Sequence, residues 1–137
     1  MILGGGCHCG AIAVEFETAR APEALPVREC QCSFCRRHAA LNTVDPEGRV
    51  RIVAAPGALS RYRFALGTAD FLFCARCGVY IGCTLDDAFA TLNVRVLDDA
   101  ARFTQAASPK VWDGESADGR RARRRATWTP ATVDERK

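Results

Sequence analysis

Cysteines dominate the chemistry available to this chain. Seven of its eight cysteines lie in three short clusters, at Cys7–Cys9, Cys30–Cys35 and Cys74–Cys77. Thiols in CxC and CxxC units are close enough to converge on one ion, whereas disulfides within such clusters would crosslink almost nothing. Thiolates in short clusters favour a tetrahedral ion, zinc first and an iron–sulfur centre second. Gly78, directly after the last cluster, permits the tight turn of a zinc knuckle.

The three clusters differ in how many ligands they offer. A closed four-thiolate site needs two of the two-ligand units, so we expect the first and last clusters to share an ion and to join the N-terminus to the middle of the chain. The middle cluster offers three thiols, and three ligands with an open fourth position are typical of a catalytic zinc. We therefore predict a structural zinc and a second, catalytic and more labile zinc.

The eighth cysteine leaves a second arrangement open. Together with the middle cluster, Cys83 could complete a second closed four-thiolate site, and neither ion would then have a free position. In the other interpretation, Cys83 is a small buried residue of a strand over 79–83.

Two histidines adjoin the clusters. An extended CxC unit would point the ring of His8 away from the metal, and His38 is either a surface residue or an acid–base group at the second site.

The elements that must position these clusters read mostly as strands. Apolar and polar residues alternate with period two, or form short apolar runs, over 11–17, 50–53, 60–64, 71–73, 79–83 and 90–96. Helical signals are confined to 36–41 and 98–102. Alternation of this kind is typical of half-buried strands. The pattern predicts an all-β domain, mostly antiparallel, with metal clusters at strand ends.

Length and composition exclude several classes of protein. A chain of 137 residues with 48% hydrophobic content is long enough for one domain with its own core. No apolar run approaches the roughly twenty residues of a membrane span. The start of the chain does not resemble a secretory signal, and thiols intended for metal must stay reduced, so we expect a cytoplasmic protein. The absence of glycine-rich phosphate-binding motifs argues against a nucleotide cofactor.

Basic residues gather near the C-terminus. The net charge is +3, from 19 basic and 16 acidic residues, and five arginines lie between Arg120 and Arg125. Without these five, 14 basic residues face 16 acidic ones, so the rest of the chain carries −2. We expect a zinc-binding domain over residues 1–117 and a basic, mobile segment over 118–137. The alternative is that this segment contacts nucleic acid or an acidic partner.

Three strings in this order carry a resemblance to a known family. GCHCGAI at 6–12, CQCSFCRR at 30–37 and FCARCG at 73–78 resemble the glutathione-dependent formaldehyde-activating enzymes, a family that includes centromere protein V-like domains. The resemblance implies a β-tent of small antiparallel sheets, and it favours the buried role for Cys83. It also implies a structural zinc held by Cys7, Cys9, Cys74 and Cys77. The second zinc would be held by Cys30, Cys32 and Cys35.

The resemblance also implies an activity. Members condense formaldehyde with glutathione to S-hydroxymethylglutathione, and the reverse reaction places them among carbon–sulfur lyases. Zinc with three thiolates carries a formal charge of about −1, so it is a poor Lewis acid that suits a fourth thiolate. Arg36 and Arg37 are the expected contacts for the glutathione carboxylates, unless they are only an exposed basic pair. The alternative function is a zinc-stabilised binding module whose arginine run contacts nucleic acid or an acidic protein.

Overall fold

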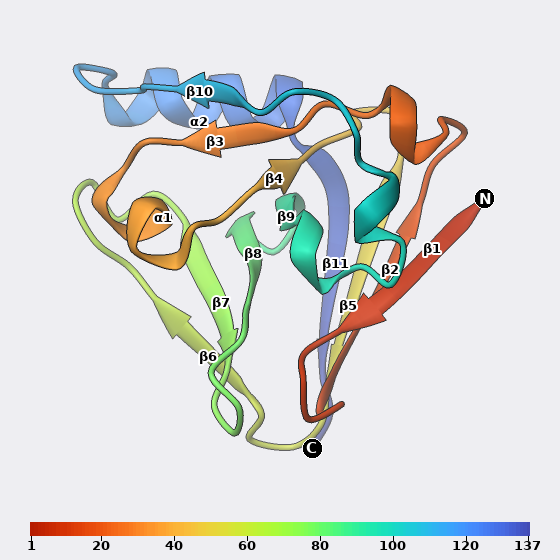
Figure 1. Cartoon of the computed structure of the whole chain (residues 1–137). Helices are drawn as coiled ribbons and strands as arrows, with labels where there is room; N and C mark the ends of the chain where they lie inside the picture. The colour runs from red at the N-terminus through yellow and green to blue at the C-terminus, as the bar shows by residue number, and fades with distance from the viewer.

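Strands make up most of the regular secondary structure, in agreement with the all-β prediction (Figure 1). The computed structural model describes residues 1–137. Its strands are β1 (Ile2–Gly6), β2 (Ile12–Glu17), β3 (Arg28–Cys30), β4 (Asn42–Thr43), β5 (Arg49–Ala54), β6 (Leu59–Tyr62), β7 (Asp70–Cys74), β8 (Tyr80–Leu85), β9 (Phe89–Asn93), β10 (Ser108–Lys110) and β11 (Thr129–Glu135). The helices are α1 (Ser33–His38) and α2 (Ala117–Thr127), with three 3-10 turns, η1 (Pro22–Ala24), η2 (Val94–Val96) and η3 (Ala100–Arg102). Neither α-helix has the length and apolar character needed to cross a membrane.

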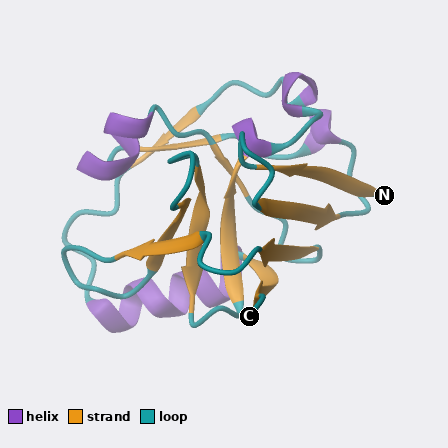
Figure 2. Ribbon diagram, turned by 90° about the horizontal axis from the view of Figure 1, so that it is seen from below, coloured by secondary structure: helices purple, strands orange, loops and turns teal.

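The last strand, β11, joins two arms of the sheet. Residues Ala131–Glu135 run parallel to β5, which continues through β2 to β1. Thr129 and Pro130 instead pair with β9, from which β8, β7 and β6 extend in one direction and β4, β3 and β10 in another. The arms approach each other toward the bottom of Figure 1, and Figure 2 shows the helices at the periphery. Two pairings, β11 with β5 and β10 with β3, are parallel, and the other pairings are antiparallel as expected.

The core forms where the sequence alternates most clearly. In β2, Ile12, Val14 and Phe16 are at most 1% exposed, and exposed residues separate them. Burying one such side chain contributes about 1.5 to 3 kcal/mol. The strand expected over 90–96 ends early, because the Asn93 side chain accepts a hydrogen bond from the backbone N–H of Arg95 (3.2 Å) and starts η2.

The C-terminal segment contradicts the expected boundary at residue 117. Residues 118–137 are not a mobile tail, because α2 and β11 are part of the domain. Ser116 begins the helix, and its Oγ accepts a hydrogen bond from the N–H of Gly119 (3.0 Å). Trp128 then packs into the core with 5% exposure. The sequence does not reveal this role, because α2 is rich in arginine and β11 carries few apolar residues.

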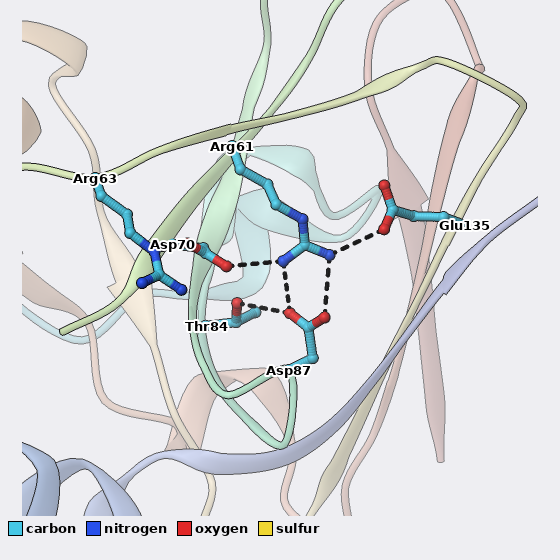
Figure 3. Close-up of polar contacts among 6 residues, drawn as sticks. All are labelled: Arg61, Arg63, Asp70, Thr84, Asp87 and Glu135. Carbon is cyan, nitrogen blue, oxygen red and sulfur yellow. Dashed lines mark hydrogen bonds and ion pairs between the residues drawn. The ribbon is translucent and has the colours of Figure 1, made fainter. Parts of the chain in front are cut away.

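An ion-pair network fastens β11 to the far arm (Figure 3). The Arg61 guanidinium in β6 contacts carboxylates of Asp70 (2.8 Å), Asp87 (2.8 and 3.0 Å) and Glu135 (3.1 Å). Arg63 makes a further hydrogen bond to Asp70. The network therefore links β6, β7, the turn after β8 and the end of β11.

Acid should weaken this network. Burial raises the pKa of Asp70, but hydrogen bonds from Arg63 and Arg61 outweigh burial, so the pKa is lowered overall. A carboxyl with a lowered folded-state pKa stabilises the fold above its unfolded pKa, near pH 4, and loses this effect as the pH falls through the folded value. We expect Asp70→Asn to lower the free energy of unfolding by about 1 to 3 kcal/mol at pH 7. The difference should shrink below about pH 4.

Urea unfolding at a series of pH values measures this effect. Glu15→Gln is the control, because Glu15 makes only an exposed pair with Arg51 at 3.9 Å. A stability difference for Asp70→Asn that stays constant from pH 7 to pH 3 would contradict the assignment.

Candidate functional site

The first and last cysteine clusters meet at one point. The Sγ atoms of Cys7, Cys9, Cys74 and Cys77 all lie within 4.8 Å of one another. The Cys9 sulfur is 3.7 Å from those of Cys7 and Cys74. Two sulfurs on a tetrahedral zinc, at about 2.3 Å each, would lie about 3.8 Å apart, so the donor set fits zinc. The structure thus brings together the two units that the sequence analysis paired, and their ligand role stays a prediction.

Two tight turns build this four-cysteine cluster. Gly10 and Gly78 follow the two units with φ of +83° and +80°, a region that glycine adopts without strain. The N–H of Gly78 donates to the carbonyl of Cys74 (2.8 Å) and closes the second turn. Backbone N–H groups of Val79 and then Cys9 lower the pKa of Cys77 to about 6. The thiolate that a metal requires is therefore already favoured at neutral pH.

The three-cysteine cluster lies where β3 leads into α1. Its Sγ atoms, from Cys30, Cys32 and Cys35, lie within 4.8 Å of one another. Cys32 caps the helix, and its sulfur accepts a hydrogen bond from the N–H of Cys35 (3.3 Å). Hydrogen bonds from the thiols of Cys30 and Cys35, together with the backbone N–H groups of Cys35 and Phe34, lower the pKa of Cys32 to about 2. Cys35 is 4% exposed while the other two are half-buried, so the cluster opens on one side.

A cleft of about 530 Å³ begins at that open side. Cys30 and Cys32 form one wall, and Arg36 of α1 lies beside them. Arg37 does not line the cleft, and its guanidinium donates to the carbonyl of Ser33 (3.2 Å) instead. Consecutive helical residues point about 100° apart, which agrees with the different directions of the two arginines. The structure therefore separates the two arginines, and a substrate-binding role for Arg37 stays a prediction.

Two further arginines, which were not predicted as site residues, reach this cleft from α2. Arg120 lines the cleft and pairs with Glu115 (3.3 Å). Arg124, one helical turn later, is 8% exposed and donates to the Thr68 hydroxyl (2.8 Å). Their spacing of four residues, which places both on one helix face, was the available signal. This spacing indicates a shared face only in a helix, and the segment was expected to be mobile.

The remaining candidate residues lie outside both cysteine clusters. Cys83 is 3% exposed, and its sulfur does not lie within 4.8 Å of all three middle sulfurs. Burial raises its pKa, so it behaves as a small buried residue. His38 packs against Phe34 with ring centroids 4.4 Å apart. His8 is exposed and belongs to neither group of sulfurs.

These features define a mostly β protein with two cysteine clusters that could each hold a metal ion. A family model described as glutathione-dependent formaldehyde-activating enzyme matches residues 2–116, and the chain belongs to this family. The crystal structure of a Rhodobacter sphaeroides protein is similar, with a TM-score of 0.61 and 29% sequence identity over 78% of this chain and 99% of that chain. The resemblance noted from the three strings is confirmed. Helix α2 and strand β11 follow the matched residues.

Proposed function

We propose that the protein is a zinc-dependent enzyme of the carbon–sulfur lyase type. It would form or cleave the adduct of a thiol, glutathione, with an aldehyde such as formaldehyde. The observation that carries this proposal is the set of three convergent sulfurs, of which Cys30 and Cys32 face a cleft of about 530 Å³. A zinc ion on these three thiolates would supply an open position for a substrate thiolate. Both clusters need reduced thiols, which supports a cytoplasmic location.

The cleft offers separate contacts for the two ends of glutathione. Arg36 makes no ion pair within the protein, so its guanidinium is available to a substrate carboxylate at the mouth of the cleft. Arg120 supplies a second cation, although it shares Glu115 with Arg123. Phe64 and Trp112 provide apolar walls in the same cleft. In the synthetic direction the sulfur–carbon bond forms, the carbonyl π bond breaks, and the thiol proton ends on the new hydroxyl.

The alternative function as a nucleic-acid or protein-binding module receives less support. A binding function of this kind needs a free basic segment, whereas the arginine run is part of helix α2. Arg121 and Arg125 both approach Asp86 at 3.6 Å, and Arg123 pairs with Glu115 at 2.8 Å. The helix therefore presents neutralised or inward-facing arginines, and we do not propose nucleic acid as a partner.

Exchange between glutathione, formaldehyde and their adduct, followed by NMR, tests the enzyme proposal. The zinc-loaded protein should exceed the uncatalysed rate, and Cys32→Ser should abolish the excess. Arg36→Gln should raise the KM for glutathione by about tenfold, as expected for a lost charge-assisted hydrogen bond. Arg37→Gln, adjacent and equally charged but outside the cleft, is the matched control and should leave KM unchanged. A rate no greater than that of a protein-free control would overturn the proposal.

A further inference from the structure

A second, smaller cavity adjoins the three-cysteine cluster. Its volume is about 60 Å³, and it shares Cys30, Phe71, Trp112 and Arg124 with the cleft. Cys35, which does not reach the cleft, contributes to its wall. Because one water needs about 10 to 15 Å³ of such space, the cavity holds roughly four to six water-sized groups. It therefore has room for a small ligand beside the sulfurs.

This cavity is strongly cationic. Arg28, Lys110, Arg123 and Arg124 line it, and no aspartate or glutamate does. Only Arg123 has a carboxylate partner, Glu115, at 2.8 Å, and the other three cations make no ion pair. Burial lowers the pKa of both Arg28 and Arg124. Against three unpaired cations, a three-thiolate zinc would supply one negative charge, so two positive charges remain uncompensated.

Residues with unsatisfied polar atoms line the same cavity. Four buried side-chain polar atoms of the protein lack a hydrogen-bond partner, and three of them belong to residues of this wall: Asn42 Oδ1, Tyr80 Oη and Arg124 Nε. The three residues are 4%, 3% and 8% exposed. Buried polar groups in folded proteins are almost always paired, with protein or with ordered water, so three such atoms around one cavity favour a polar occupant. Arg124 Nε and the Tyr80 hydroxyl can donate, and Asn42 Oδ1 can accept from a hydroxyl.

We propose that this cavity binds a small carboxylate, and that the electrophile of the reaction is an aldehyde that carries a carboxylate group. The identity of this electrophile rests on the proposed function. Formaldehyde is neutral and gives the unpaired cations nothing to bind, whereas a two-carbon aldehyde acid fits both the volume and the charge. Arg124 would hold its carboxylate, with Arg28 and Lys110 supplying further positive charge. Addition forms the sulfur–carbon bond, breaks the carbonyl π bond, and moves the thiol proton to the oxygen that becomes a hydroxyl near Asn42.

Arg124 comes from helix α2, a segment that follows residues 2–116, which match the family model. Its guanidinium is held in place by Thr68 (2.8 Å) and by the Trp128 ring, 4.7 Å from the guanidinium carbon. A guanidinium fixed in this way pays little further ordering entropy when an anion binds.

Calorimetric titration of the zinc-loaded protein tests the carboxylate site without any thiol or aldehyde. The probe is oxamate, an unreactive analogue of glyoxylate, at constant ionic strength, and acetamide is the neutral comparison. We expect oxamate to bind and acetamide not to bind. Arg124→Gln should weaken oxamate by about ten- to a hundredfold, as for a lost hydrogen bond to a charged group. Arg125→Gln is the matched control, since Arg125 lies on the same helix and contacts only exposed Asp86.

A second variant keeps the test decisive if Arg124→Gln fails to fold. Lys110 lies on the short strand β10 and is half-exposed, so Lys110→Gln should fold and should weaken oxamate several-fold. Equal oxamate affinity in the wild-type protein and these variants, or no oxamate binding at all, would overturn the proposal.

Kinetics then separate this inference from the proposed function. The rate excess over the uncatalysed reaction should be at least about tenfold larger with glyoxylate than with formaldehyde, and Arg124→Gln should remove this preference. Oxamate binding without accelerated thiol addition would leave the carboxylate site standing and reject the enzyme. Acceleration with formaldehyde and no oxamate binding would support the enzyme and reject the carboxylate site.

Discussion

Replacing Cys74 by serine should unfold the protein, whereas the same change at Cys32 should leave it folded. Cys74 ends β7 and is 1% exposed, and its sulfur lies 3.7 Å from that of Cys9, which follows β1. A metal at this point would crosslink parts of the chain 65 residues apart. Structural zinc contributes about 10 kcal/mol or more in zinc-finger peptides. A domain with a core of 16 buried residues depends on it less.

We expect Cys74→Ser to lower the free energy of unfolding by about 5 kcal/mol or more, which equals the whole stability of many domains. Circular dichroism during heating, combined with zinc analysis, measures this. Cys32→Ser is the matched control, because Cys32 is half-buried at the edge of the cleft and should lose only the second zinc. An unchanged melting temperature for Cys74→Ser, with both zinc ions retained, would reject the structural role of the four-cysteine cluster.

A chain that ends at Thr127 should not fold, although the sequence presents its C-terminus as a polar tail. The deletion removes β11, the only strand that pairs with both β5 and β9, and leaves the edges of the two arms without a partner. It also removes Trp128, and Trp→Ala substitutions in protein cores alone cost about 3 to 5 kcal/mol. The sum approaches or exceeds the stability of a typical domain.

Two variants make this experiment specific. A chain that ends at Glu135 keeps β11 and the Arg61–Glu135 ion pair, so it should melt close to the full-length protein. Trp128→Ala in the full-length chain should lower the urea midpoint, and Trp112, which lines the cleft, then reports folding by its fluorescence. A cooperative melt for the chain that ends at Thr127 would show that the two arms are stable without β11.

Local signals were sufficient to predict the cysteine clusters. A CxC or CxxC unit brings its two sulfurs together through the geometry of a few residues, and Gly10 and Gly78 supply the turns. The alternation in β2 likewise places Ile12, Val14 and Phe16 on one face whatever the strand pairs with. These features depend on neighbours in the chain, so the sequence predicted the all-β class, the individual cysteine units and the family. The pairing of the first and last units, whose Cys9 and Cys74 lie 65 residues apart, followed instead from the four ligands that a closed site needs.

Only the tertiary structure decided the role of the C-terminal arginines. Hydrophobic patterning cannot reveal β11, because its burial comes from β5 and β9, whose residues lie roughly 40 to 80 positions earlier in the chain. Helix α2 leads directly into β11 and contributes Arg124 to the cavity beside the three-cysteine cluster, where Arg124 is a buried cation instead of a solvated one. A run of charged residues in a sequence is normally interpreted as exposed to water. The long-range pairing of β11 removes that exposure, and with it Arg124 acquires its place at the candidate site.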